Sequence, residues 1–454
     1  MSGGRPLRAA RSPPNPWGDF DDLFDPYPGR SGAKPRARED GQGRAGNERR
    51  GRDSNPRWRF TPHTHLAGGR LKPLGHLSGY GARTAKRAEP RSVRYRLMWR
   101  RVLVVWSASR LAVLSLGLLL TTQLGWHRAL EPWQTKFFRS ITGWDSVYYL
   151  KLSHTGYHPG KDVAFFPFYP ATIWAAREVL QVGDAVAAVA ISNLALLVGL
   201  VGMYVLARDR LSEAHARRGV LYLVLSPYAF ALAMAYSEGL FLALATWLFV
   251  LSDRRRDLAA VPLAFAAGLT RVTGLALVAP LTLRAWRRKT VGSWVLAATP
   301  LAAFGAHAAW LQHAVGDPLA MVHVQSRWGG HPAFPLVSLA DQFLDFVRTH
   351  DVFFLIVGVT VVAYLALLLP ILRREIFAPN RWEDVLYVGG IFALPLLSGV
   401  LQSSGRFGLV AFPLVFAMAD LGLRSERVHR AYIVYAPTAQ IILFAAAALG
   451  YRPP

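Results

Sequence analysis

From residue 98 to the end of the chain, long apolar segments alternate with short polar or charged ones. Most of these segments run to about 20 residues, the length at which an α-helix crosses the ~30 Å hydrocarbon layer of a membrane. We therefore expect an all-α, polytopic transmembrane protein with about 11 spans, and not a soluble domain. The expected spans are 102–124, 184–206, 219–235, 238–252, two short helices in 258–284, then 291–312, 350–372, 384–401, 406–423 and 431–449.

Clusters of Lys and Arg orient these spans, because such clusters stay on the cytoplasmic side of a membrane. The first cluster, 91–101, precedes the first span, and others follow at 208–218, 254–256, 284–289, 373–374 and 424–427. With all of them inside, two long loops lie outside, 125–183 and 313–349, and we expect these loops to carry juxtamembrane helices. The prediction is a multi-pass protein of the plasma membrane whose active site faces the extracytoplasmic side.

Two apolar segments do not fit a single crossing. Segment 165–182 is short and contains Arg177 and Glu178, and a full crossing would move the cluster 208–218 outside. We expect it to form a juxtamembrane or re-entrant helix on the outer side. Segment 258–284 has basic clusters at both ends, so we expect a hairpin of two short helices broken at 270–274. Broken backbone at membrane depth is tolerated where it lines a cavity.

Residues 1–97 are rich in Gly, Pro, Arg and Ser and show almost no apolar periodicity. Such a segment cannot bury enough apolar surface to offset its chain entropy, so we expect a disordered basic tail. A basic tail can bind anionic lipid. The alternative is a start site assigned too far upstream, because no Met lies between Met1 and Met98; the working protein then begins near Met98. The transmembrane domain is expected over 98–454.

Composition narrows the chemistry further. The chain has a net charge of +24 and no Cys, which excludes a disulfide scaffold, Cys-ligated zinc, iron–sulfur clusters and thiol catalysis. Membrane topology accounts for the basic residues, so we expect membrane lipid and not nucleic acid as a partner. The His residues show no paired spacing and no second Asp adjoins Asp145, so we expect no metal and no cofactor. No phosphate-binding Gly-rich loop lies on the inner side, which disfavours a nucleotide-sugar donor.

The predicted topology gathers unusual polar residues on the outer face. These residues are Asp145, Glu238, Arg271, Arg327 and Arg406. A channel would distribute polar groups through the bilayer, and an inverted-repeat transporter would place its site near the midplane. Charges collected at one face suggest an outward-facing active site.

The segment 143–170 contains the most informative motif. Asp145 lies among aromatic residues at the membrane boundary, and in a helix over 144–154 Trp144 and Tyr148 share one stripe. A carboxylate held in such a wall can act as a general base. Two other interpretations are open: the aromatic residues form an interfacial belt, and Asp145 caps a helix.

Four short motifs in order resemble the mannosyltransferase family typified by GPI mannosyltransferase II (PIG-V) and its bacterial relatives. They are Trp144-Asp145 with Phe165–Pro170, Ser226-Pro227 with Tyr236–Phe241, Arg271–Leu275, and Gly405–Phe407 with Phe412-Pro413. The resemblance covers roughly residues 100–425. That family is similar to the multi-span glycosyltransferases of the GT-C fold, which take sugar from a polyprenyl-phosphate carrier at the extracytoplasmic or lumenal face.

The resemblance implies that Asp145 is the catalytic base of a mannosyl transfer from a polyprenyl-phosphate donor. Arg271 and Arg406 are the candidates for binding the donor phosphate, because guanidinium groups suit phosphate oxygens. Candidates for acceptor or sugar contacts are Trp144, Tyr148, Glu238, Arg327 and Trp328. The acceptor, a glycan, lipid or protein, stays open. So do two alternatives: another polyprenyl-phosphate sugar, and a transporter or lipid-handling protein without transferase activity.

Overall fold

The computed structural model describes residues 91–124, 133–377 and 382–450, all within one compact unit that spans Ala85–Pro454. The described residues form helices and no strands, which confirms the all-α class. The helices are α2 (Arg91–Leu119), α3 (Trp133–Ile141), α4 (Asp145–Thr155), α5 (Phe168–Leu180), α6 (Asp184–Arg210), α7 (Glu213–Leu225), α8 (Glu238–Asp253), α9 (Asp257–Thr270), α10 (Val278–Arg288), α11 (Val291–Val315), α12 (Ala320–His323), α13 (Pro335–Thr349), α14 (Val352–Ala366), α15 (Leu368–Phe377), α16 (Trp382–Ser398), α17 (Ser404–Val410), α18 (Phe412–Arg424) and α19 (Glu426–Ala448).

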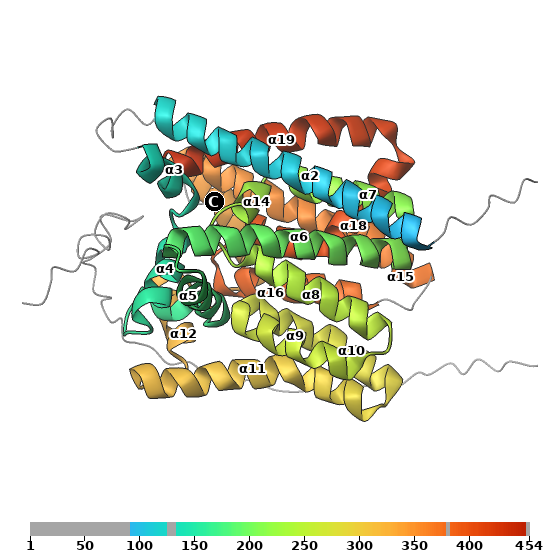
Figure 1. The fold of residues 1–454 in the computed structure, drawn as a ribbon, viewed down its shortest axis with the longest axis horizontal. Helices are drawn as coiled ribbons and strands as arrows, with labels where there is room; N and C mark the ends of the chain where they lie inside the picture. Colours follow the sequence, from blue (N-terminus) through green and yellow to red (C-terminus); the bar gives the residue numbers. More distant parts are fainter. Residues whose placement is uncertain (1–90, 125–132, 378–381, 451–454) are drawn as a thin grey trace, which may run out of the picture. The chain divides into compact units, whose positions relative to one another are not determined.

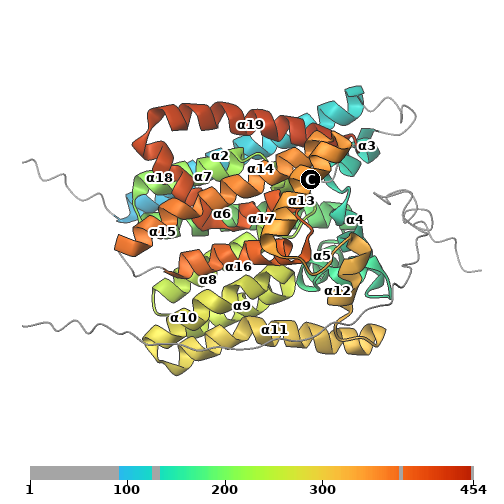
Figure 2. The same cartoon turned by 180° about the vertical axis from the view of Figure 1, so that it is seen from behind.

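The long helices of this unit run side by side along one direction (Figures 1 and 2). Helix α6 packs on α8, α8 on α9, and α9 on α11. Helices α2 and α19 both pack on α7. Short helices α3, α4, α5 and α12 gather at one end of the bundle, which we call the site end. The opposite end carries the C-termini of α6, α8 and α10, and we call it the arginine end.

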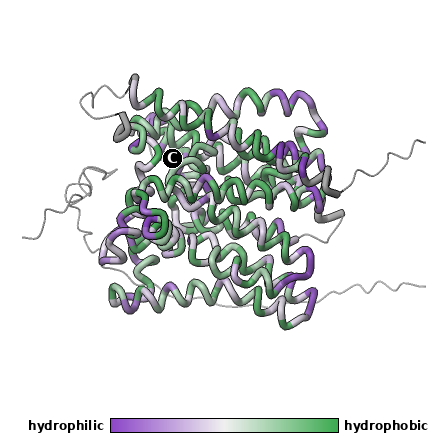
Figure 3. The backbone as a smooth tube through the Cα atoms, viewed as in Figure 1, coloured by the Kyte–Doolittle hydropathy of each residue, from purple (hydrophilic) through white to green (hydrophobic). Residues whose placement is uncertain are grey.

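Hydropathy follows this arrangement. Apolar residues fill the middle of the bundle, and hydrophilic residues concentrate towards its two ends (Figure 3). Large apolar side chains are also exposed on the outer surface of the long helices, for example Leu111 on α2, Leu194 on α6 and Leu301 on α11. A surface that is apolar along the helices and polar at their ends fits a lipid bilayer, so the chain is an integral membrane protein.

In the part of the chain that the structure describes, five helical stretches are long and apolar enough to cross a membrane. They are Arg96–Thr122, Asp184–Arg210, Val291–Val315, Val352–Arg373 and Glu426–Ala448. Helices α17 and α18, bent by 80° at their junction, make up to six if they count as one span. The expected count of about 11 spans is therefore not confirmed. Several expected spans are shorter helices within the bundle, and α7 ends at Leu225 because Ser226-Pro227 follows and proline restricts the residue before it.

The two apolar segments that did not fit a single membrane crossing form short helices in the structure. Helix α5 has 13 residues, about 20 Å of helix at ~1.5 Å per residue, and packs on α4 and α6 at the site end. Residues 257–288 form a hairpin of α9, a 3₁₀ turn (Val272–Leu277) and α10. An ion pair of 2.6 Å between Asp257, the first residue of α9, and Arg288, the last residue of α10, joins the two ends of this hairpin, so both basic clusters lie at the arginine end.

The predicted tail lies outside the described residues up to residue 90, and residues 91–97 belong to α2. Of the long loop 125–183, residues 125–132 also lie outside the described part of the chain. The rest of this loop contains α3, α4 and α5, and the loop 313–349 contains α12 and α13. Both loops carry the helices that the sequence predicted for them.

Candidate active site

A cavity of ≈ 300 Å³ opens at the site end, where several parts of the chain meet. Asp145 and Tyr149 of α4, Arg271 at the hairpin break, Trp328 after α12, and Arg406 of α17 all line it. Most of the other lining residues are apolar, and they include Phe165, Phe166, Val272, Phe304, Met321, Leu394 and Phe407. Four of the predicted functional residues, Asp145, Arg271, Trp328 and Arg406, thus share one cavity although they are far apart in the sequence.

Asp145 is the first residue of α4, and Trp144 before it has a φ of 57°, a conformation that bulky residues rarely adopt. The indole of Trp144 donates a hydrogen bond of 3.1 Å to the carbonyl of Ala447 on α19, which holds this backbone turn in place. Because Trp144 is the N-cap residue, the Asp145 carboxylate does not cap α4. It forms a 2.7 Å ion pair with Arg406 instead, and its side chain keeps 27% of its surface exposed to the cavity.

Glu238 is the first residue of α8, and its carboxylate is fully buried beneath the two arginines. One carboxylate oxygen lies 2.7 Å from Arg271 and 3.3 Å from Arg406. Both guanidinium groups are themselves nearly buried, and two carboxylates against two arginines leave no net charge in this cluster. Glu238 does not line the cavity; the structure places it where it holds both arginines.

Arg271 occupies the break between α9 and the 3₁₀ turn that leads to α10. Its guanidinium donates a 3.0 Å hydrogen bond to the Ser237 hydroxyl and lies 5.4 Å from the ring centre of Phe407. The break needs Gly274, because a Cβ there would be 2.7 Å from the Cα of Gly268. Only a residue without a side chain lets the turn fold this close to α9 and direct Arg271 towards Glu238.

Arg406 connects the two carboxylates. One of its terminal nitrogens is bound to Asp145 and donates 2.7 Å to the Ser403 hydroxyl, and the other is bound to Glu238. The guanidinium also lies 4.9 Å from the ring centre of Tyr236, within the range of a cation–π contact. These contacts fix the guanidinium at the cavity wall.

Tyr149 and Ser237 extend the polar cluster and were not among the predicted site residues. The Tyr149 hydroxyl is 2.8 Å from the Ser237 hydroxyl, which in turn accepts from Arg271. Burial raises the pKa of Tyr149 to about 12, so the phenol stays neutral at physiological pH. Both residues adjoin predicted ones in the sequence, Tyr149 one turn after Asp145 and Ser237 directly before Glu238, and that proximity is the signal that could have found them.

The remaining predicted contacts take different positions. Trp328 lines the cavity. The ring of Tyr148 stacks on that of Phe165, with 4.9 Å between the ring centres, and meets Trp328 edge-on, with 5.3 Å between the ring centres. Tyr148 therefore supports two lining residues without itself being part of the lining. Trp144 packs towards α19, and Arg327 is exposed outside the cavity. Their roles as acceptor or sugar contacts stay predictions.

Metal ligation was not expected at this site. Within the described ranges, no group of three or more His, Asp or Glu side chains is arranged to hold a metal ion. The carboxylates of Asp145 and Glu238 are instead bound to arginines. A metal-free and cofactor-free reaction stays a prediction.

The fold and the cavity define an integral membrane protein with a carboxylate–arginine site at one end of a helical bundle. Residues 100–288 match the family described as mannosyltransferase (PIG-V). Over these residues the match confirms the resemblance found in the sequence. It covers Asp145, Glu238 and Arg271 and ends before Arg406, whose place in the site is shown by the structure alone.

Two solved structures resemble this fold. The Archaeoglobus fulgidus oligosaccharyltransferase, solved with zinc and sulfate, is 11% identical with a TM-score of 0.39 over 75% of this chain and 54% of its own. This chain thus spans about half the length of that protein. ArnT from Cupriavidus metallidurans, solved bound to undecaprenyl phosphate, is 15% identical with a TM-score of 0.41 over 80% of this chain and 78% of its own. Likeness at this level does not bear on the substrate. No curated protein matches this sequence.

Proposed function

We propose that this protein transfers a mannosyl-type sugar from a polyprenyl-phosphate donor to a hydroxyl of an extracytoplasmic acceptor. The observation that carries the proposal is the convergence of Asp145, Arg271 and Arg406 on one cavity. Asp145 is the only carboxylate in the described lining, so it is the candidate that can reach a substrate. The family match over residues 100–288 supports the sugar.

The reaction needs one base and one binding site for the leaving group. Asp145 accepts the proton of the acceptor hydroxyl while the hydroxyl oxygen attacks the anomeric carbon of the sugar. The bond between that carbon and the phosphate oxygen breaks, and the polyprenyl phosphate leaves with the electron pair. A single carboxylate is sufficient for such an inverting displacement. A retaining glycosidase would use two carboxylates about 5 Å apart that both face the substrate, whereas Glu238 is fully buried.

The two arginines are placed to stabilise the charge that develops on the phosphate. Guanidinium groups bind phosphate oxygens with two parallel hydrogen bonds, and in a site shielded from water this interaction is strong. Arg406 is already bound to Asp145 in the structure, at 2.7 Å. A donor phosphate gives Arg406 a further anionic partner besides Asp145 and Glu238, and the loosened ion pair then lets Asp145 turn towards the acceptor.

The apolar part of the cavity is suited to the rest of the donor. Its apolar lining includes Phe165, Phe304, Met321, Leu394 and Val400. Trp328 adds an aromatic face on which a pyranose ring can pack. With the arginine end placed in the cytoplasm by its positive charge, this cavity faces the extracytoplasmic side, where polyprenyl-phosphate sugars act as donors.

A transfer assay with defined donors tests the proposal. The full-length chain, reconstituted in liposomes with an acceptor-containing membrane extract, is given polyprenyl-phosphate mannose, polyprenyl-phosphate glucose or GDP-mannose, each radiolabelled in the sugar. We expect label to move into an acceptor fraction only from polyprenyl-phosphate mannose. Arg271→Ala should reduce the transfer, whereas Arg348→Ala, which removes a largely exposed arginine of α13 outside the cavity, provides the control.

The donor that is used separates the alternatives. Transfer from polyprenyl-phosphate glucose alone would retain the mechanism and change the sugar. Transfer from GDP-mannose alone would refute the lipid-linked donor. Donor bound or moved across the membrane, without transfer in the presence of acceptor fractions, would favour a transporter or lipid-handling protein.

A further inference from the structure

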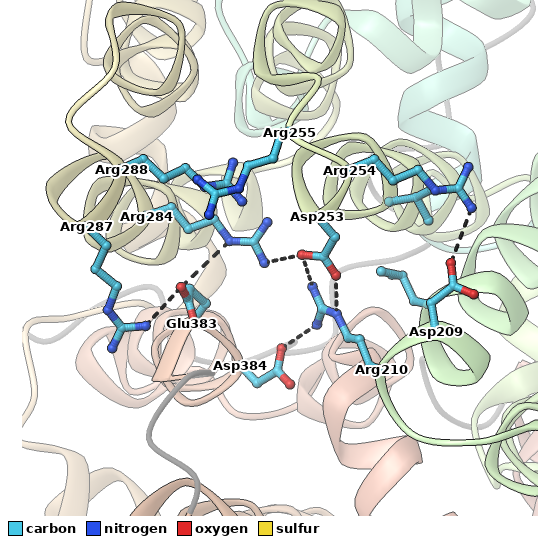
Figure 4. A pocket seen from close by; sticks show the side chains of 12 residues that line it. Asp209, Arg210, Asp253, Arg254, Arg255, Arg284, Arg287, Arg288, Glu383 and Asp384 are labelled. Carbon is cyan, nitrogen blue, oxygen red and sulfur yellow. Dashed lines mark hydrogen bonds and ion pairs between the residues drawn. The ribbon is translucent and has the colours of Figure 1, made fainter.

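A second cavity, of ≈ 590 Å³, lies at the arginine end, where α6, α8 and α10 end and α16 begins. Figure 4 shows its charged lining. Six arginines and four carboxylates line it, namely Arg210, Arg254, Arg255, Arg284, Arg287, Arg288, Asp209, Asp253, Glu383 and Asp384. The mechanism proposed for the site end uses none of these residues.

The deep part of this cavity is an ion-pair network that joins helix ends. Arg210, with 3% of its side chain exposed, is 2.7 Å from Asp253 and 2.7 Å from Asp384. Asp253 is also 2.8 Å from Arg284 (Figure 4). Buried charges are tolerated when they are paired in this way, so this layer serves to hold α6, α8, α10 and α16 together.

The mouth of the cavity differs from its deep part in charge, because arginines outnumber carboxylates at the mouth. Arg254 lies 3.2 Å from Asp209 and Arg287 lies 3.2 Å from Glu383, and the two arginine side chains keep 47% and 36% of their surface exposed. Arg255 is exposed and its side chain has no partner among the described residues. It lies in the tight turn between α8 and α9 with a φ of 61°, and no dashed line reaches it in Figure 4.

We propose that this cavity binds a phosphate group through the arginines at its mouth. Several guanidinium groups around one concave site match the oxygens of a phosphate, which can accept hydrogen bonds from more than one of them. The cavity also lies at the end of α6, a 27-residue helix long enough to cross the bilayer, and therefore at the depth of the lipid head groups. Basic pockets between transmembrane helices on the cytoplasmic side bind anionic head groups.

Two sources can provide this phosphate. One is the head group of an anionic phospholipid in the adjacent leaflet, and the other is a soluble phosphate compound. The ligand chemistry is the same in both cases. In either case the ligand would connect Arg255, just before α9, with Arg287, at the end of α10. It would thereby link the two ends of the hairpin that contains Arg271 at its break.

Two binding measurements on the full-length chain distinguish these sources. In nanodiscs of phosphatidylcholine with a small fraction of phosphatidylglycerol, native mass spectrometry counts the anionic lipids that stay bound. In pure phosphatidylcholine, the thermal unfolding midpoint is measured against pyrophosphate concentration. The cavity variant is Arg255→Gln with Arg287→Gln. The matched control is Arg424→Gln with Arg430→Gln, which removes the same charge from two largely exposed arginines outside this cavity.

We expect the cavity variant to bind its ligand about tenfold more weakly and the control to bind like the wild type. Selective loss of retained phosphatidylglycerol would identify the lipid head group, and selective loss of the pyrophosphate effect would identify a soluble ligand. Equal loss in both variants would overturn the proposal, since it would show only general attraction to a basic surface. Absence of any difference would overturn it too. Arg255→Gln alone breaks no ion pair among the described residues, so it keeps the test valid if the double variant is unstable.

Discussion

Asp145→Asn is the substitution that separates the chemistry of the site most clearly from its stability. It keeps the size of the side chain and removes the group that is proposed to accept the proton. Arg406 loses its 2.7 Å partner but keeps Ser403 at 2.7 Å and Glu238 at 3.3 Å. The variant therefore leaves no buried guanidinium without a partner.

The two effects of this substitution differ in size. Asp145 is partly exposed, and the loss of one charged hydrogen bond from a cluster that retains two others costs about 1–2 kcal/mol of unfolding free energy. Removal of a positioned general base reduces turnover by about 10²–10⁴-fold, equivalent to about 2.7–5.5 kcal/mol in the activation free energy. Turnover should thus fall much further than stability.

Single-turnover transfer from labelled polyprenyl-phosphate mannose measures the chemical step, and the thermal unfolding midpoint of the same preparation measures stability. Binding of unlabelled polyprenyl phosphate, measured separately, reports on the arginines. The matched control is Asp345→Asn, which removes an ion-paired carboxylate from α13, 3.5 Å from Arg348 and outside the cavity. We expect it to transfer sugar at the wild-type rate.

Three results would contradict the reasoning. A transfer rate within tenfold of the wild type would exclude Asp145 as the base. A loss of rate with an equal loss of folded protein would show a structural role. A loss confined to donor binding, with a normal single-turnover rate at saturation, would mean that Asp145 acts only by positioning Arg406.

Further substitutions examine the other parts of the site. Arg271→Ala should raise the donor concentration needed for half-maximal rate by about 10- to 100-fold with a smaller effect on the saturated rate; unchanged donor affinity would remove Arg271 from the phosphate site. Glu238→Gln should lower the unfolding free energy by about 3–5 kcal/mol, because it leaves Arg271 buried without a carboxylate; denaturant unfolding checks this, and a loss under 1 kcal/mol would contradict it. Gly274→Ala should cost about 1–3 kcal/mol and weaken donor binding, because the new Cβ would meet Gly268 at 2.7 Å; full stability with normal binding would show that the break does not depend on glycine.

The sequence predicted features that depend on short stretches of chain. The hairpin broken at 270–274 was predicted because basic clusters at both ends of an apolar segment would end on opposite sides after a single crossing, and the structure has this hairpin. The helix at 168–180 follows from a segment too short to cross. In both cases the physical cause lies within about 30 residues of the chain, so the pattern was sufficient.

The pattern of apolar and charged residues could not predict contacts between segments that are distant in the sequence. The sequence separates Glu238 from Arg406 by 168 residues, and nothing local shows that one carboxylate holds both arginines. The span count was not confirmed for a related reason: apolar composition marks burial, and it does not distinguish a helix buried among other helices from one that crosses the membrane. The turn at Trp144 also depends on α19, 303 residues away, which holds its indole.

The ion pair between Asp145 and Arg406 has a consequence for the end of the catalytic cycle. In the structure the protein's own carboxylate occupies the guanidinium that a phosphate would otherwise bind. Under the proposed chemistry Asp145 is protonated and neutral just after transfer, and the spent carrier phosphate then has no competitor for Arg406. Once the proton passes to water, the carboxylate regains its charge and can displace the phosphate. Departure of the used carrier is therefore coupled to loss of the acceptor's proton, and the same pair that starts the reaction resets the enzyme.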